Sequence, residues 1–246
     1  MSAVTGSQLL HQPVARELGV EVIEGVWAAG SARTLEELQN RFRVSRTVAR
    51  EASRQLEAMG LVSSRRRLGL VAQPMAEWNV LDPLLIDWRL HSGHREDQIR
   101  SLTQLRLAVE PAAAESAARH ASIHTRARLL PLAAEMRRTG EAGELHDFMA
   151  FDIEFHRLLL ESCGNELFAA LSPLVAVVLQ GRTELGLMPP QPKPEALDGH
   201  EAVADAVFRG DPEAARAAMQ AILDEVRSAF TDADEAASAS LKAHSA

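Results

Sequence analysis

The chain has 246 residues, 46% of them hydrophobic, and a formal net charge of −8, values typical of a soluble globular protein of one or two domains. It has no apolar run long enough to span a bilayer and no signal-peptide layout at its start, so we expect a cytoplasmic protein without membrane contact. The single cysteine, Cys163, cannot form an internal disulfide and is expected to be a buried structural thiol.

Charge is unevenly distributed along the chain. Residues 1–74 hold ten arginines and seven acidic residues, whereas residues 75–246 hold 16 basic and 27 acidic residues. Eight arginines lie between Arg41 and Arg67 against only two glutamates, a local surplus that suits DNA phosphates. The asymmetry predicts a small nucleic-acid reader joined to a larger acidic domain with another role.

The start of the chain predicts two helices. Apolar residues recur at helical spacing from Val14 to Trp27, including Val26, and Gly30 is expected to end that helix. Thr34 followed by Glu37 is the pattern of a capping box, which opens a second, short helix through Phe42.

A third helix and a hairpin complete the predicted reader. Ser45 can cap a helix that runs to Gly60, and LVSS and LGLVA flank three arginines as a β-hairpin wing with Gly69 at the bend. Donor side chains on the first turns of such a helix can reach the major groove, and a basic wing can reach phosphates. A solvated helix face is the plainer interpretation for any one of these arginines. The candidate DNA-binding residues are Ser45, Arg46, Thr47, Arg50, Arg54, Arg65, Arg66, Arg67 and Gly69.

The segment VSRTVAREASRQLEAMGLV resembles the recognition helix of the GntR family of bacterial regulators. The resemblance covers about 60 residues and implies a winged helix-turn-helix in which Arg46, Thr47 and Arg50 contact operator DNA with help from the wing. The chain departs from the family at SARTLEEL, where Glu36 stands in place of an arginine that contacts DNA in some members. The operator sequence can therefore differ.

Residues 75–94 are predicted to be a linker helix. Trp78, Leu81, Leu85 and Trp88 give one apolar face, and Pro83 is expected to begin the helix proper. Beyond the linker the pattern predicts six or seven helices and no strands, an all-helical domain over residues 95–231, and a disordered tail over residues 232–246. The expected helices lie near 97–120, 124–138, 142–163, 165–187, 195–209 and 212–231.

Polar residues interrupt the apolar faces of three predicted helices. Asp152 and His156 lie one turn apart on one face, His200 lies on a second, and Arg106 lies on a third. Because buried charges are costly unless they are paired or bound, these positions are candidate ligand sites. An aspartate and two histidines can bind a divalent metal, and Arg106 can bind a carboxylate; an internal Asp–His hydrogen bond is the alternative.

The helical remainder resembles the FCD effector domain of the FadR branch of GntR regulators over about residues 97–230. In metal-binding members, the resemblance implies that Asp152, His156 and His200 are three of four ligands and that the fourth is a histidine. Ile222 stands at that position here, so one divalent metal (Zn, Mn or Ni) and a metal-free pocket both remain open. The motifs that carry the resemblance are LRLAVEP with Arg106 and Glu110, DIEFH, Gly164-Asn165, and GH with His200.

The linker string EWNVLDPLLIDW is similar to that of FCD regulators that respond to sugar acids such as galactonate. The resemblance implies an effector whose carboxylate meets Arg106 or the metal, in a site formed by Arg106, Asp152, His156 and His200. We add Arg182 as a further candidate contact. We therefore expect a transcription regulator, a repressor that binds double-stranded operator DNA as a homodimer. Another carboxylate, such as a hydroxy or keto acid, is the alternative effector.

A metal-dependent enzyme acting on a small organic acid is the rival interpretation, because Asp152, His156 and His200 around a metal also resemble a hydrolase or isomerase centre. The chain has no recognisable motif for a nucleophile or general base, and an enzyme would give the basic N-terminal reader no purpose. The sequence therefore favours a regulator that is not an enzyme.

Overall fold

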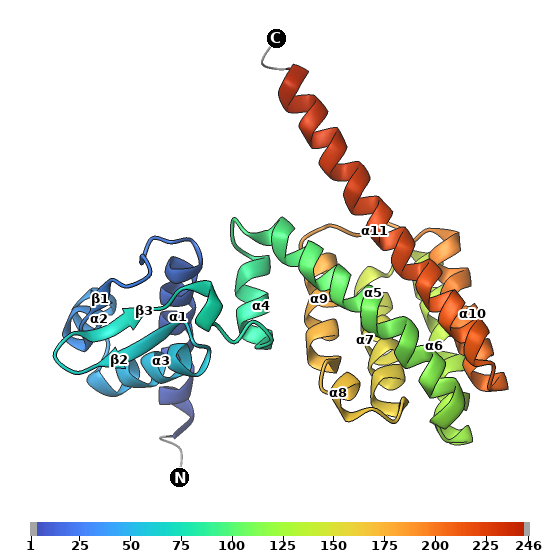
Figure 1. Ribbon diagram of the computed structural model, residues 1–246, viewed down its shortest axis with the longest axis horizontal. Helices are drawn as coiled ribbons and strands as arrows, with labels where there is room; N and C mark the ends of the chain where they lie inside the picture. Colours follow the sequence, from blue (N-terminus) through green and yellow to red (C-terminus); the bar gives the residue numbers. More distant parts are fainter. Residues whose placement is uncertain (1–3, 244–246) are drawn as a thin grey trace. The chain divides into compact units, whose positions relative to one another are not determined.

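The computed structural model describes the backbone of residues 4–243 and the side chains of residues 10–228. The chain divides into two compact units between Gln98 and Ile99 (Figure 1). None of the described helices combines the length and the apolarity that a membrane span requires.

The first unit is a winged helix-turn-helix, as predicted. Its core includes Leu18, Trp27, Leu38 and Leu56, all of them buried. The strands are antiparallel in the order β1-β3-β2 (Figure 1). The elements are α1 (Val4–Ile23), β1 (Ala32–Arg33), α2 (Leu35–Phe42), α3 (Arg46–Ala58), β2 (Val62–Arg65) and β3 (Gly69–Ala72).

Local capping positions α2 and α3. Thr34 and Glu37 form the predicted capping box, and the Ser45 hydroxyl accepts a hydrogen bond from the Val48 amide. These bonds satisfy amide groups that the first turn of a helix would otherwise leave without partners, so the start of each helix is defined by short-range sequence.

The predicted bounds of the first helix are wrong at both ends. α1 begins at Val4 and includes Pro13, and it ends at Ile23, because Gly25 takes a left-handed conformation with φ of 73°. Val26 therefore leaves the expected apolar stripe and is 71% exposed, whereas Trp27 is buried in the core.

The wing is a two-stranded hairpin to which β1 adds an unpredicted third strand. Arg65 pairs with Gly69, so the bend lies at residues 66–68 with Arg67 at φ 68°, and Gly69 begins β3 instead of forming the bend. Gly69 has φ 93°, and a Cβ there would crowd the carbonyl of Arg33. Glycine is therefore required for the pairing of β1 with β3.

The linker contains a short 3₁₀ helix, η1 (Met75–Glu77), and α4 (Pro83–Leu90), which Asp82 caps and Pro83 begins as expected. Leu85 and Trp88 are buried in the core of the first unit, and a Cβ on Gly19 would overlap the Trp88 ring. Leu81 precedes the helix and is 53% exposed, so its predicted place on the apolar face is wrong. By its packing, α4 is part of the first unit.

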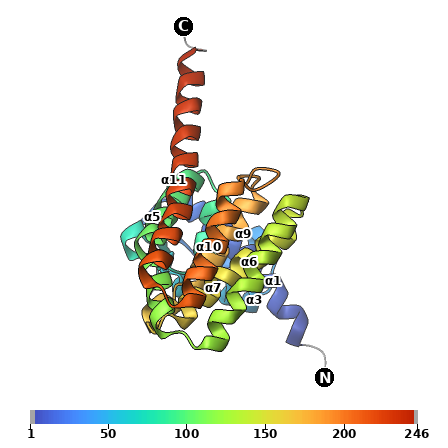
Figure 2. The same ribbon diagram turned by 90° about the vertical axis from the view of Figure 1, so that its right-hand side faces the viewer.

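The second unit is a helical bundle. α10 packs against α6 and α11, and α7 packs against α6 and α9, which Figures 1 and 2 show from two sides. Its core is rich in alanine and leucine around Phe155 and Met219. The helices are α5 (Arg95–His120), α6 (Ile123–Ala142), α7 (Leu145–Ser162), α8 (Glu166–Ala169), α9 (Ser172–Glu184), α10 (Pro194–Arg209) and α11 (Pro212–Ala243).

Two expectations for this unit differ from the structure. The single helix predicted over 165–187 is divided into α8, which Asn165 caps, and α9, in which Pro173 occupies the first turn. The tail predicted to be disordered continues α11 as far as Ala243, because its alanine-rich composition favours helix. Residues 244–246 of that tail lie outside the described residues.

Candidate functional site

The first turns of α3 present polar side chains to solvent. Arg46, Thr47 and Arg50 are exposed, whereas Val48 and Ala52 face the core. Two further candidates are engaged within the chain: the Ser45 hydroxyl caps α3, and Arg54 lies 2.7 Å from Glu51 in an exposed ion pair. The exposed face of α3 therefore has the geometry of a recognition helix.

The wing adds an exposed basic tip. Arg65, Arg66 and Arg67 are all exposed around the bend, and Gly69 follows as the first residue of β3. Glu36, at the start of α2, is exposed and lines a shallow hollow together with Asn40 and Arg46. The Glu36 carboxylate thus lies near the exposed first turn of α3.

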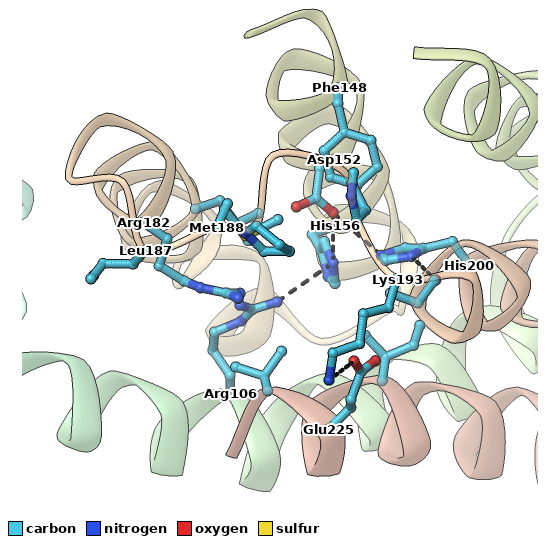
Figure 3. Close-up of a pocket in the computed structure, with 16 residues that line it drawn as sticks. Arg106, Phe148, Asp152, His156, Arg182, Leu187, Met188, Lys193, His200 and Glu225 are labelled. Atoms are coloured by element: carbon cyan, nitrogen blue, oxygen red, sulfur yellow. Dashed lines mark hydrogen bonds and ion pairs between the residues drawn. The ribbon is translucent and has the colours of Figure 1, made fainter. Parts of the chain in front are cut away.

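In the second unit, side chains from α5, α7, α9, α10 and α11 line a cavity of about 100 Å³ (Figure 3). The lining includes every residue of the predicted effector site, together with Arg182. It also includes apolar side chains, among them Phe148, Leu179, Met188 and Ile222. The fold therefore brings Arg106, Asp152, His156 and His200 to one cavity.

Asp152, His156 and His200 form a buried cluster. The Asp152 Oδ1 atom lies 3.2 Å from His156 Nε2 and 3.3 Å from His200 Nε2. One ligand atom from each residue lies within 4.8 Å of the other two. Within the side chains that the structure describes, neither Asp152 Oδ1 nor His200 Nε2 makes a hydrogen bond. Buried polar atoms left in this way are typical of a site that a ligand or ion completes.

The other ring nitrogen of each histidine faces an acceptor. His200 Nδ1 lies 2.7 Å from the Ala196 carbonyl oxygen, and His156 Nδ1 lies 2.7 Å from Glu110 Oε2. This arrangement favours a proton on Nδ1 and leaves Nε2 as the ligand atom, as in most histidine–metal sites. The three residues therefore fit a divalent metal with three protein ligands.

Arg106 and Glu110 form a buried bidentate ion pair one helical turn apart. Arg106 Nε and Nη2 lie 2.6 and 3.2 Å from the two Glu110 oxygens, and Nη2 also lies 3.5 Å from His156 Nε2. Burial raises the pKa of the Glu110 carboxyl, but the charges of Arg106 and His156 outweigh burial and hold this pKa at about 2. Glu110 thus links the arginine to the histidine cluster.

The same balance of burial and charge acts on the cluster itself. Burial lowers the pKa of His156, but Glu110 and Asp152 outweigh burial and raise this pKa to about 9. Burial raises the pKa of Asp152, but its contacts with His156 and His200 hold the pKa well below the usual range. In the metal-free chain, the cluster therefore pairs an ionised carboxylate with a charged imidazole.

Glu110 belongs to the motif LRLAVEP, but the sequence alone does not indicate its role in the site. Its spacing four residues after Arg106 on a helix is the available signal for an ion pair. Lys193 and Glu225 form a second unpredicted contact, an ion pair of 3.1 Å at the edge of the cavity. Ile222 is buried and occupies the space beside Gly199, where a Cβ would lie 2.6 Å from Ile222 Cγ1.

Comparison with known proteins divides the chain as the fold does. Residues 10–71 match "Bacterial regulatory proteins, gntR family", and residues 101–225 match "FCD domain". The chain is 30% identical to the galactonate operon transcriptional repressor of Escherichia coli K12, over 85% of this chain and 92% of the relative. It is 29% identical to the HTH-type transcriptional repressor NanR of Cronobacter sakazakii, over 92% of this chain and 90% of the relative.

Solved structures share the fold at lower identity. One is E. coli McbR/YncC, with 15% identity, a TM-score of 0.52 and coverage of 91% of this chain and 97% of that one. Another is Lar, which controls the expression of the Listeria monocytogenes agr system, with 16% identity, a TM-score of 0.54 and coverage of 90% and 96%. The chain belongs to the GntR family of bacterial transcription regulators and joins a DNA-binding winged helix to an effector-responsive FCD domain.

Proposed function

We propose that this regulator is a repressor whose affinity for its operator is controlled by a small organic acid bound in the cavity of the second unit. The observation that carries the proposal is the buried cluster of Asp152, His156 and His200, which opens on the same cavity as Arg106. A sugar acid is the first choice, because a relative with 30% identity is named for the galactonate operon.

The cavity has the donors and acceptors that such an acid requires. Arg106 offers N–H groups to a carboxylate. Asp152 Oδ1 and His200 Nε2 are buried and make no hydrogen bond within the described side chains, so hydroxyl groups of the acid can bind to them. Apolar lining side chains such as Phe148 and Ile222 can contact the carbon chain. A short hydroxy or keto acid would use the same groups.

A divalent metal held by Asp152, His156 and His200 would supply a Lewis-acid attraction for oxygen atoms of the effector. Because Ile222 provides no donor atom, three protein ligands would leave positions for those oxygens. Metal binding requires His156 to lose its second proton, so Glu110 would then hold the remaining proton on Nδ1.

On the DNA side, we propose that a homodimer reads a pseudo-palindromic operator through Arg46, Thr47 and Arg50, with Arg65–Arg67 on flanking phosphates. One winged helix reads too few base pairs for genomic specificity, and two-fold proteins match two-fold sites. The effector alters repression only if it binds the DNA-competent and DNA-free arrangements with unequal affinity.

The test is thermal unfolding of the purified protein with a panel of aldonates and short hydroxy and keto acids, each with and without EDTA. A ligand that binds the folded state raises the midpoint, and the same acid should release a fluorescent operator fragment in an anisotropy titration. His200→Ala should lose both responses, while His124→Ala, at an exposed position, should keep them. If no acid shifts the midpoint or releases the operator, the proposed effector class is wrong.

A further inference from the structure

Arg43 lies in the turn between α2 and α3, two residues before the serine that caps the recognition helix. Its side chain is exposed, and no hydrogen bond or ion pair engages that side chain within the described residues. The nearby Arg41 differs, because the carboxylates of Glu17 and Glu21 pair with its guanidinium group. The positive charge of Arg43 is therefore available to a partner outside the chain.

The backbone of Arg43 takes the left-handed conformation, with φ of 52° and ψ of 42°. This conformation ends α2, and the Arg43 amide donates a hydrogen bond to the Gln39 carbonyl. Stability favours glycine or asparagine at such a position, because other side chains crowd their own backbone there. In the described backbone, only one other non-glycine residue has a positive φ: Arg67, at the tip of the wing. Both exceptions are exposed arginines of the DNA-reading unit, and residues held in such conformations gather at functional sites.

The turn of a helix-turn-helix comes close to the DNA backbone. When the second helix enters the major groove, the first helix crosses the phosphates that border the groove. We infer that Arg43 binds one of these backbone phosphates and so fixes the position of α3 in the groove. A guanidinium group suits this task, because it donates charge-assisted, bidentate hydrogen bonds to phosphate oxygens. The inference rests on the proposed function, in which α3 reads the operator through Arg46, Thr47 and Arg50.

A phosphate contact has a signature that a base contact lacks. It carries no sequence information, so Arg43 contributes to the binding of any duplex, whereas a base contact contributes only to the matching sequence. It also releases condensed counterions, so each lost contact reduces the slope of log affinity against log salt concentration by about 0.9. Salt dependence on two different duplexes therefore identifies the kind of contact that Arg43 makes.

The test compares full-length wild-type protein with three variants of Arg43. Arg43→Gln removes the charge and keeps the crowded backbone, Arg43→Gly removes both, and Arg43→Lys keeps the charge. The probes are two fluorescein-labelled DNA duplexes of equal length, one selected by the wild-type protein from a random library and one of unrelated sequence. Anisotropy titrations at several salt concentrations give the affinity and the salt slope, and thermal unfolding gives the stability of each variant.

We expect Arg43→Gln and Arg43→Gly to bind both duplexes at least about eightfold more weakly at about 0.1 M salt, with the salt slope reduced by about 0.9 for each bound protomer. Arg43→Lys should keep the wild-type slope. Arg43→Gly should unfold at a higher midpoint than Arg43→Gln, because glycine takes a positive φ without crowding. Arg209→Gln removes an exposed arginine of the second unit, which pairs with Asp205, and should change neither the affinity nor the slope.

Three results would overturn the inference. Wild-type binding by Arg43→Gln would make Arg43 a solvated turn residue, and a loss in Arg43→Gly alone would mean that the turn acts through its backbone. A loss confined to the selected duplex would indicate a base contact instead of a phosphate contact.

Arg50→Ala separates this inference from the proposed function. This variant should lose the preference for the selected duplex, because Arg50 is proposed to read bases. If Arg50→Ala keeps that preference, the proposed recognition helix is wrong. If Arg50→Ala loses it while Arg43→Gln binds as wild type does, only the phosphate contact of Arg43 is refuted.

Discussion

Replacing Glu110 with glutamine tests whether one carboxylate stabilises the buried polar side chains Arg106 and His156. The substitution keeps the shape of the side chain but leaves the buried Arg106 guanidinium, 3% exposed, without its bidentate counter-ion. Loss of one partner of a buried pair costs about 3–5 kcal/mol. Because Asp152 still attracts Arg106, we expect the lower end, about 3 kcal/mol, which lowers the unfolding midpoint of a unit of this size by about 6–12 °C.

The distribution of tryptophans provides an assay for each unit. Trp27, Trp78 and Trp88 are the three tryptophans of the chain, and all of them precede Gln98. Tryptophan fluorescence therefore reports unfolding of the first unit, whereas far-ultraviolet circular dichroism reports the helices of both units. Glu110→Gln should lower the transition seen by circular dichroism more than the one seen by fluorescence.

The matched control is Glu115→Gln on the same helix. Glu115 pairs with Arg119 and Arg216 where solvent reaches all three side chains, so its replacement should shift the midpoint far less. Equal shifts for the two variants would refute the claim that Glu110 compensates a buried charge.

Three further substitutions test other parts of the structure. Arg50→Ala should weaken operator binding by about 1–3 kcal/mol in an anisotropy titration without a change in thermal unfolding; unchanged specific binding would mean that the recognition helix is misplaced. Gly19→Ala should destabilise the first unit by about 1–3 kcal/mol and alter tryptophan fluorescence, because its Cβ would overlap the Trp88 ring; an unchanged urea midpoint would contradict that packing. Ile222→His should raise zinc affinity in a competition titration with a chromogenic chelator, and equal affinity would show that position 222 does not face the cluster.

Local chemistry explains which parts of the fold could be predicted. The caps at Thr34 and Ser45 depend on residues three positions away, so the sequence predicted the starts of α2 and α3 correctly. The exposed position of Val26 was missed because it depends on where the chain leaves the helix at Gly25. β1 was missed because a strand of two residues has no periodicity and exists only by pairing with β3.

The candidate site was predicted in part for a similar reason. Asp152, His156, His200 and Arg106 interrupt apolar stripes, which a helical projection detects, and the structure brings all four to one cavity. Arg182 and Arg106 lie on different helices, α9 and α5, and both line the cavity, so no spacing within one helix encodes their meeting there.

The membership of α4 in the first unit bears on where this protein can be divided for engineering. A chimaera joined at Pro74 would leave behind Leu85 and Trp88, so the truncated reader would expose the apolar surface that these side chains cover around Gly19. A junction after Gln98 keeps that surface covered. The portable DNA-reading cassette of this regulator is therefore residues 1–98, about a third longer than its helix-turn-helix and wing.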